Sequence, residues 1–119
     1  MALELLVPDY TEMKTTLSGA VSKGDSVTLN ETNGFYFVDG VSGDVASVVT
    51  KARKVSGPLA AVAVVEGEAA YINAGNLTNV SAGGTLIGYF IESVDNSGGS
   101  AGDLDAIVDF DGMLAFAKA

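Results

Sequence analysis

The stretch that decides the fold class is GPLAAVAVVEGEAAYINAGNLTNVSAGGTLIGYFIE, which runs from Gly57 to Glu92. In it, apolar segments that favour β-structure alternate with turns rich in glycine and asparagine. Leu59–Val65 and Leu86–Ile91 are almost continuously apolar, so each is expected to form a strand that is covered on both faces. A small protein achieves such cover by closing a barrel, by packing two sheets together or by assembling into an oligomer.

The rest of the chain carries similar short β signals, with turn signals recurring about every 8–12 residues. Asn33-Gly34 is expected to form a hairpin turn, and Gly57-Pro58 is expected to end a strand. No stretch shows the 3.6-residue period of a long helix. Further strands are expected at Ser26–Leu29, Phe35–Val38, Asp44–Thr50, Ala69–Ile72, Leu77–Val80, Thr85–Glu92 and Leu104–Phe110.

These signals predict an all-β protein, a compact single-domain β-barrel or β-sandwich with an extended N-terminal arm. The chain of 119 residues has the size of one domain, and no linker or sequence repeat divides it. We place the arm at residues 1–17 and the β domain at residues 18–119. Met13–Leu17 fits either a short helix or a strand, and the threonines in it favour a strand within the arm.

Composition argues against several classes of function. The chain has no cysteine and no histidine, which removes disulfides, thiolate metal sites and the commonest general base. Its net charge of −9 repels nucleic acid. The longest apolar runs are far shorter than the ~20 residues that span a membrane. Met1–Val7 lacks the basic start and the cleavage site of a signal peptide, so we expect synthesis in the cytoplasm, without nucleic-acid or membrane partners.

Two groups of carboxylates are candidates for chemistry. Glu66 and Glu68 would lie roughly 6–7 Å apart on one face of a strand, a separation that suits glycosidases, although a polar turn around Gly67 explains them more simply. Four aspartates near the C-terminus offer oxygen ligands for Ca²⁺, but their spacing is not that of an EF-hand loop and a solvated strand face explains them more simply. No metal or cofactor is predicted. The four aspartates near the C-terminus are Asp103, Asp105, Asp109 and Asp111.

The basic residues are unevenly distributed. Lys51, Arg53 and Lys54 make up half of the six basic residues, whereas the chain from Leu59 onward has eight acidic residues and one basic residue. The three basic side chains either belong to an ordinary solvated strand or bind an acidic surface. That surface would belong to a neighbouring copy of the chain or to another protein.

Four short motifs follow one another between Ala20 and Phe110. They are Lys23-Gly24-Asp25-Ser26-Val27, Gly43-Asp44-Val45, Glu66-Gly67-Glu68-Ala69-Ala70-Tyr71 and Leu86-Ile87-Gly88-Tyr89-Phe90. Their order resembles the small capsid decoration (cement) proteins of tailed bacteriophages. In that family Gly-Asp precedes new strands, a Gly-acid-x-x-Tyr segment follows, and Ile/Val-Gly precedes the last core strands.

The resemblance implies a compact β fold on the outer surface of an icosahedral head, often as a homotrimer, that clamps neighbouring major capsid subunits without catalysis. The mean hydropathy of +0.35 independently suggests that apolar surface meets another chain. A tail or spike β-domain, a Ca²⁺-dependent carbohydrate-binding module and an enzyme using Glu66 and Glu68 remain alternatives. The expected contact residues are Leu5, Leu6, Val7, Tyr10 and Met13 of the arm, with Lys51, Arg53 and Lys54.

Overall fold

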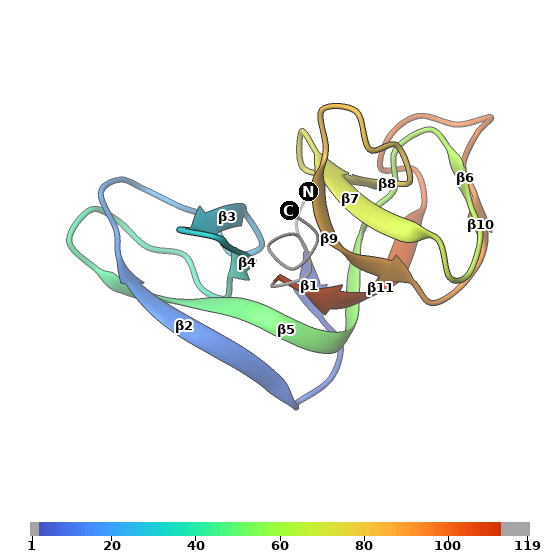
Figure 1. Ribbon diagram of the computed structural model, residues 1–119. Coiled ribbons are helices and arrows are strands. Elements are labelled where there is room, and N and C mark those ends of the chain that lie inside the picture. Colours follow the sequence, from blue (N-terminus) through green and yellow to red (C-terminus); the bar gives the residue numbers. More distant parts are fainter. Residues whose placement is uncertain (1–2, 113–119) are drawn as a thin grey trace.

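One long strand organises the structure. The computed structural model describes residues 3–112, and within that range it contains strands and no helix. β5 (Val45–Pro58), with 14 residues, is the longest strand and passes through both halves of the molecule (Figure 1). The other strands are β1 (Glu4–Leu5), β2 (Tyr10–Thr16), β3 (Ser26–Leu29), β4 (Thr32–Tyr36), β6 (Ala63–Val64), β7 (Ala69–Asn73), β8 (Asn76–Thr78), β9 (Thr85–Phe90), β10 (Val94–Asp95) and β11 (Asp105–Asp111).

The sheet is antiparallel and curls into a half-barrel with the order β3-β4-β5-β11-β9-β7-β8. β2 and β4 both pair with Val48 and Val49, so they lie on opposite edges of β5. Further along, β1 and β11 pair with opposite edges at Val55 and Ser56. β5 is therefore hydrogen-bonded on both edges at each end. The predicted all-β, single-domain fold is confirmed.

The N-terminal residues belong to this sheet. β2 confirms the strand expected within the arm, and the earlier β1 pairs with the other end of β5. Leu3 is buried at 3 % exposure, and Leu5 and Val7 pack against the same core. β2 and the first half of β5 form a ribbon, with β4 on the other edge of β5, that extends away from the other half of the molecule (Figure 1).

The core lies inside the curl. The rings of Phe35 and Phe110 meet edge-to-face with centroids 5.2 Å apart, joining β4 to β11. Leu59 and Leu77 are fully buried in the same cluster and form a parallel bridge just after β5. Burial of such side chains, about 1.5–3 kcal/mol each, supplies the main driving force for folding. The other buried apolar residues in this cluster are Leu3, Val49, Ala52, Val55, Val64, Ala70, Ile72, Ile87, Phe90, Ala106 and Val108.

Two predictions of local structure are wrong. Leu59–Val65 is not a buried strand, because only Ala63–Val64 is in β6, and Ala61, Ala63 and Val65 are exposed. The chain bends after Leu59, where the side-chain amide of the buried Asn96 donates to the carbonyls of Leu59 and Ala60. The central buried strand is β5. The sequence pattern did not indicate this, because three charged residues interrupt its apolar run.

The predicted Asn33-Gly34 turn is also wrong, because both residues lie inside β4. The hairpin turn is Asn30-Glu31, and Asn30 adopts the left-handed conformation with φ of 57°. Gly34 is needed for packing, since a Cβ there would lie 2.5 Å from a methyl carbon of Val48. Asn33 is buried, and its side chain links Thr28 to the carbonyl of Leu86.

A four-residue turn recurs before five strands. In each turn the third residue is a glycine with positive φ, and the N–H of the fourth residue donates to the carbonyl of the first. In four of the five turns the fourth residue is acidic, and its carboxylate accepts the N–H of the first residue. The turns precede β3, β5, β7, β9 and β11 and contain Gly24, Gly43, Gly67, Gly83 and Gly102.

The close approach of β9 to β11 predicts a severe effect of Gly88→Ala. A Cβ at Gly88 would overlap the carbonyl oxygen of Asp109, and the φ of 151° is itself unfavourable for alanine. We expect the free energy of unfolding to fall by about 3 kcal/mol in urea titrations. Gly98→Ala is the control, because nothing lies within 4 Å of its Cβ position. Equal stability of the two variants would contradict this packing.

The acidic turns predict a smaller effect of Asp44→Ala. This change removes the carboxylate oxygen that lies 2.9 Å from the backbone nitrogen of Val41. We expect thermal and urea denaturation to show a loss of about 1 kcal/mol, typical of one exposed hydrogen bond. Asp105→Ala, which removes an exposed carboxylate from β11, should cost less. If both variants lose the same stability, the turn carboxylate has no special role.

Candidate docking surface

The three basic residues identified in the sequence are all exposed, and a bulge in β5 explains why the neighbours Arg53 and Lys54 are both exposed. Val108 pairs with Val55 and Phe110 pairs with Ala52, so the single residue Asp109 faces both Arg53 and Lys54. In a regular strand, adjacent side chains alternate between the two faces. The extra residue breaks this alternation, and both Arg53 and Lys54 project into solvent. The bulge therefore exposes two neighbouring positive charges, which regular alternation would have placed on opposite faces of the strand.

The surroundings of this bulge combine positive and negative charge. A shallow depression of about 200 Å³ crosses β5 and is lined by Lys51 and Arg53. Lys51 forms an ion pair with Asp111, its Nζ lying 3.9 Å from Oδ2. Among residues 3–112, neither Arg53 nor Lys54 has a carboxylate within ion-pair distance. The other residues that line the depression are Asp9, Tyr10, Thr11, Ala52 and Asp109.

The apolar residues expected at the contact surface divide into two groups. Leu5, Val7 and Tyr10 are half-buried against the core, and Tyr10 stacks on Phe37 with ring centroids 5.4 Å apart. Leu6 and Met13 remain exposed at 45 % and 41 %. Leu6 lies beside the bulge, where its N–H donates to the carbonyl of Lys54 over 2.9 Å. Met13 lies on the ribbon, opposite Val48.

The outer strand of the ribbon is open along one edge and on both faces. Within the described part of the chain β2 pairs only with β5, so its other edge has no strand partner. Thr11, Glu12, Met13 and Lys14 are all exposed, which means that both faces of the strand reach solvent. Val45 was not among the contact residues expected from the sequence. It lies at the end of the ribbon opposite Thr16 and is 67 % exposed. An open edge with exposed apolar side chains is suited to pairing with another chain.

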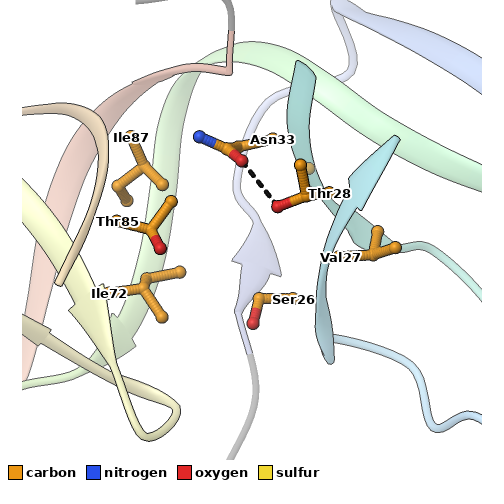
Figure 2. Close-up of a pocket in the computed structure, with 8 residues that line it drawn as sticks. Ser26, Val27, Thr28, Asn33, Ile72, Thr85 and Ile87 are labelled. Atoms are coloured by element: carbon orange, nitrogen blue, oxygen red, sulfur yellow. Dashed lines mark hydrogen bonds between the residues drawn. The ribbon is translucent and has the colours of Figure 1, made fainter. Parts of the chain in front are cut away.

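A second concave region lies between the β3–β4 hairpin and β7 and β9. A pocket of about 170 Å³ shares Ser26 and Ile72 with a neighbouring one of about 280 Å³. Figure 2 shows Thr28 and Asn33 hydrogen-bonded on one side, over 2.8 Å, and Ile87 on the other side. The residues assigned to the smaller pocket are hydroxyl, amide, glycine and aliphatic residues. These residues can form hydrogen bonds and apolar contacts.

Several of the carboxylates considered in the sequence have structural partners. Glu68 accepts from the backbone nitrogen of Val65 at 2.6 Å and contacts the amide of Asn79, whereas Glu66 is exposed. Asp103 accepts from the backbone nitrogen of Ser100 at 2.9 Å. Among residues 3–112, no three acidic side chains are gathered as metal ligands. Also within that range, no helix could cross a membrane.

Asp109 also contacts an aromatic residue that the sequence did not single out. The hydroxyl of Tyr89 donates to Oδ2 of Asp109 over 3.3 Å, and the Tyr89 side chain is 45 % exposed. The negative charge of Asp109, followed by this hydrogen bond, raises the pKa of Tyr89 above its usual value near 10.0. The position of Tyr89 beside the bulge depends on the pairing of β9 with β11, which local sequence does not reveal.

Comparisons with known proteins leave the functional assignment to the geometry. No protein-family model, no curated protein and no solved structure matches the chain.

The contact between Tyr89 and Asp109 predicts a change in alkaline titration. In Asp109→Asn the pKa of Tyr89 should fall towards 10, because the negative charge that disfavours phenolate is gone. Phenolate absorbance measures the shift, and Tyr89→Phe identifies which transition belongs to this residue. Since the folded protein keeps this proton longer than the unfolded chain, wild-type stability should decline as the pH rises above 10. An unchanged Tyr89 titration in Asp109→Asn would contradict the contact.

Proposed function

We propose that this protein is a non-enzymatic decoration protein that binds the outer surface of a tailed-phage head. Its partner is the major capsid protein, and its role is to stabilise contacts between neighbouring capsid subunits. The observation that carries the proposal is the open ribbon, in which β2 exposes both faces and one edge. The motif resemblance between Ala20 and Phe110 and phage decoration proteins directs the choice of partner.

The physics of the ribbon suits a reinforcing role. A strand added to the outer edge of β2 would gain backbone hydrogen bonds, while Met13 and Val45 would lose their exposed apolar surface to the partner. Each square ångström of apolar surface removed from water contributes about 25 cal/mol. Many weak contacts of this kind, repeated over a shell, add up through effective concentration. Such a surface strengthens an assembly without any reacting group.

The proposal predicts that the ribbon carries the affinity for the capsid. In Met13→Glu/Val45→Glu, two charges replace apolar side chains that the contact would bury, so binding should weaken at least about tenfold. The measurement is the occupancy of purified heads, assembled from the major capsid protein of the same genome, over a range of protein concentrations. Val80→Glu is the control, because Val80 is 48 % exposed but lies outside the ribbon.

Heads that bind the Met13→Glu/Val45→Glu variant as tightly as the wild type would refute the ribbon as the capsid contact. Wild-type protein that ignores heads and binds purified tails would instead support a tail β-domain. Deleting the first ten residues is a poor alternative test, because it would remove β1 and the buried Leu3.

A further inference from the structure

The distribution of charge restricts how two copies of this chain can meet. Residues 59–112 contain no lysine or arginine, and all the basic residues of the described chain precede Leu59. Two copies that approach through β6–β11 therefore repel each other. Attraction requires the basic part of one copy to face the acidic part of the other. The acidic residues of this range are Glu66, Glu68, Glu92, Asp95, Asp103, Asp105, Asp109 and Asp111.

The basic partner in such a contact would be the exposed bulge. We use the name basic bulge for Arg53, Lys54 and the adjacent Leu6. Both cationic side chains are exposed and have no ion-pair partner among residues 3–112, although the chain as a whole carries a net charge of −9. Leu6 adds an apolar side chain that is 45 % exposed at the same place. The surface combines unpaired positive charge with apolar area.

A complementary surface lies at the end of the small β6–β10 ribbon. We use the name acidic tip for Val65, Glu66 and Glu92. The backbone nitrogen of Glu66 donates to Oγ of Ser93 over 3.1 Å, which brings the two segments of the tip together. Both glutamates are exposed, and Val65, the first residue of the turn before β7, is 58 % exposed. This surface therefore combines unpaired negative charge with apolar area.

We propose that the basic bulge of one copy binds the acidic tip of a second copy of this chain. Charge complementarity and the two exposed apolar side chains, Leu6 and Val65, carry the proposal. The bulge belongs to β5, whereas the tip lies beyond β6, so the contact joins two different surfaces (Figure 1). A contact of this type is head-to-tail, and it produces a ring when the rotation between copies closes. This self-association goes beyond the proposed binding to capsids.

The test uses the full chain in solution, with no capsid present. Sedimentation velocity and native mass spectrometry compare the wild type at roughly 0.05 M and 1 M salt, where the screening length falls from more than 10 Å to about 3 Å. We expect wild-type oligomers at low salt and at least a tenfold increase in dissociation constant at high salt. A wild type that is monomeric at low salt and about 100 μM protein, well above the typical range of specific affinities, would overturn the proposal.

Charge reversals identify the surfaces. Arg53→Glu/Lys54→Glu and Glu66→Lys/Glu92→Lys should each be monomeric at low salt, whereas the combined fourfold variant should assemble again. Lys14→Glu/Lys23→Glu is the control for net charge, because it reverses two exposed lysines outside the bulge and should assemble. Circular dichroism verifies that each variant folds. A folded fourfold variant that stays monomeric would overturn the assignment of surfaces.

A mixing experiment gives a second readout that does not need the fourfold variant. Arg53→Glu/Lys54→Glu offers two acidic surfaces and Glu66→Lys/Glu92→Lys offers two basic surfaces, so a mixture should form complexes in which the variants alternate. Absence of mixed complexes would count against the proposed contact. Because capsid binding is measured on heads with changes at Met13 and Val45, failure of either proposal is distinguishable from failure of the other.

Discussion

The pairing of β5 on both of its edges is the constraint on which the rest of the structure depends. β4 and β11 bind one edge, and β2 and β1 bind the other, so one strand holds the two halves of the half-barrel together. Gly112 completes the first edge, since it donates to the carbonyl of Thr50 and accepts from the backbone nitrogen of Asn33. A strand with two partners along most of its length cannot slide without breaking several ladders. Its register therefore fixes which residues become surface.

Two bulges in β5 determine which of its side chains reach the surface. At Thr50, β5 has one residue more than β2 opposite it. At Arg53 and Lys54, β5 has one residue more than β11 opposite it. Thr50 is buried at the first bulge, whereas at the second bulge two neighbouring basic side chains are exposed. A rigid, doubly paired strand can hold such irregularities in place. The proposed docking surface and the basic bulge lie on or beside this strand, whereas the acidic tip lies beyond β6.

The sequence was most informative where local chemistry decides the outcome. Alternation correctly indicated the strands around Val27, Tyr71 and Val108, and the glycine turns before Ala69 and Thr85 lie where they were expected. It was misleading where tertiary packing overrides local preference. Asn33-Gly34 has the strongest turn signal, yet a buried hydrogen-bond network and the side chain of Val48 place it inside a strand. The exposure of Lys54 and the contact of Tyr89 with Asp109 depend on register, which no local pattern encodes.

β5 is the scaffold of the fold, and we propose that a partner binds the outer edge of β2, which has no strand partner among residues 3–112. Hydrogen exchange of the backbone amides, recorded for the free protein and for the protein bound to heads, tests both parts. We predict that β5 amides exchange slowest in the free protein, and that the outward-facing amides of β2 exchange fast when free and slowly when bound. β2 amides whose exchange is unchanged by binding, or β5 amides that exchange as fast as the loops, would contradict the account.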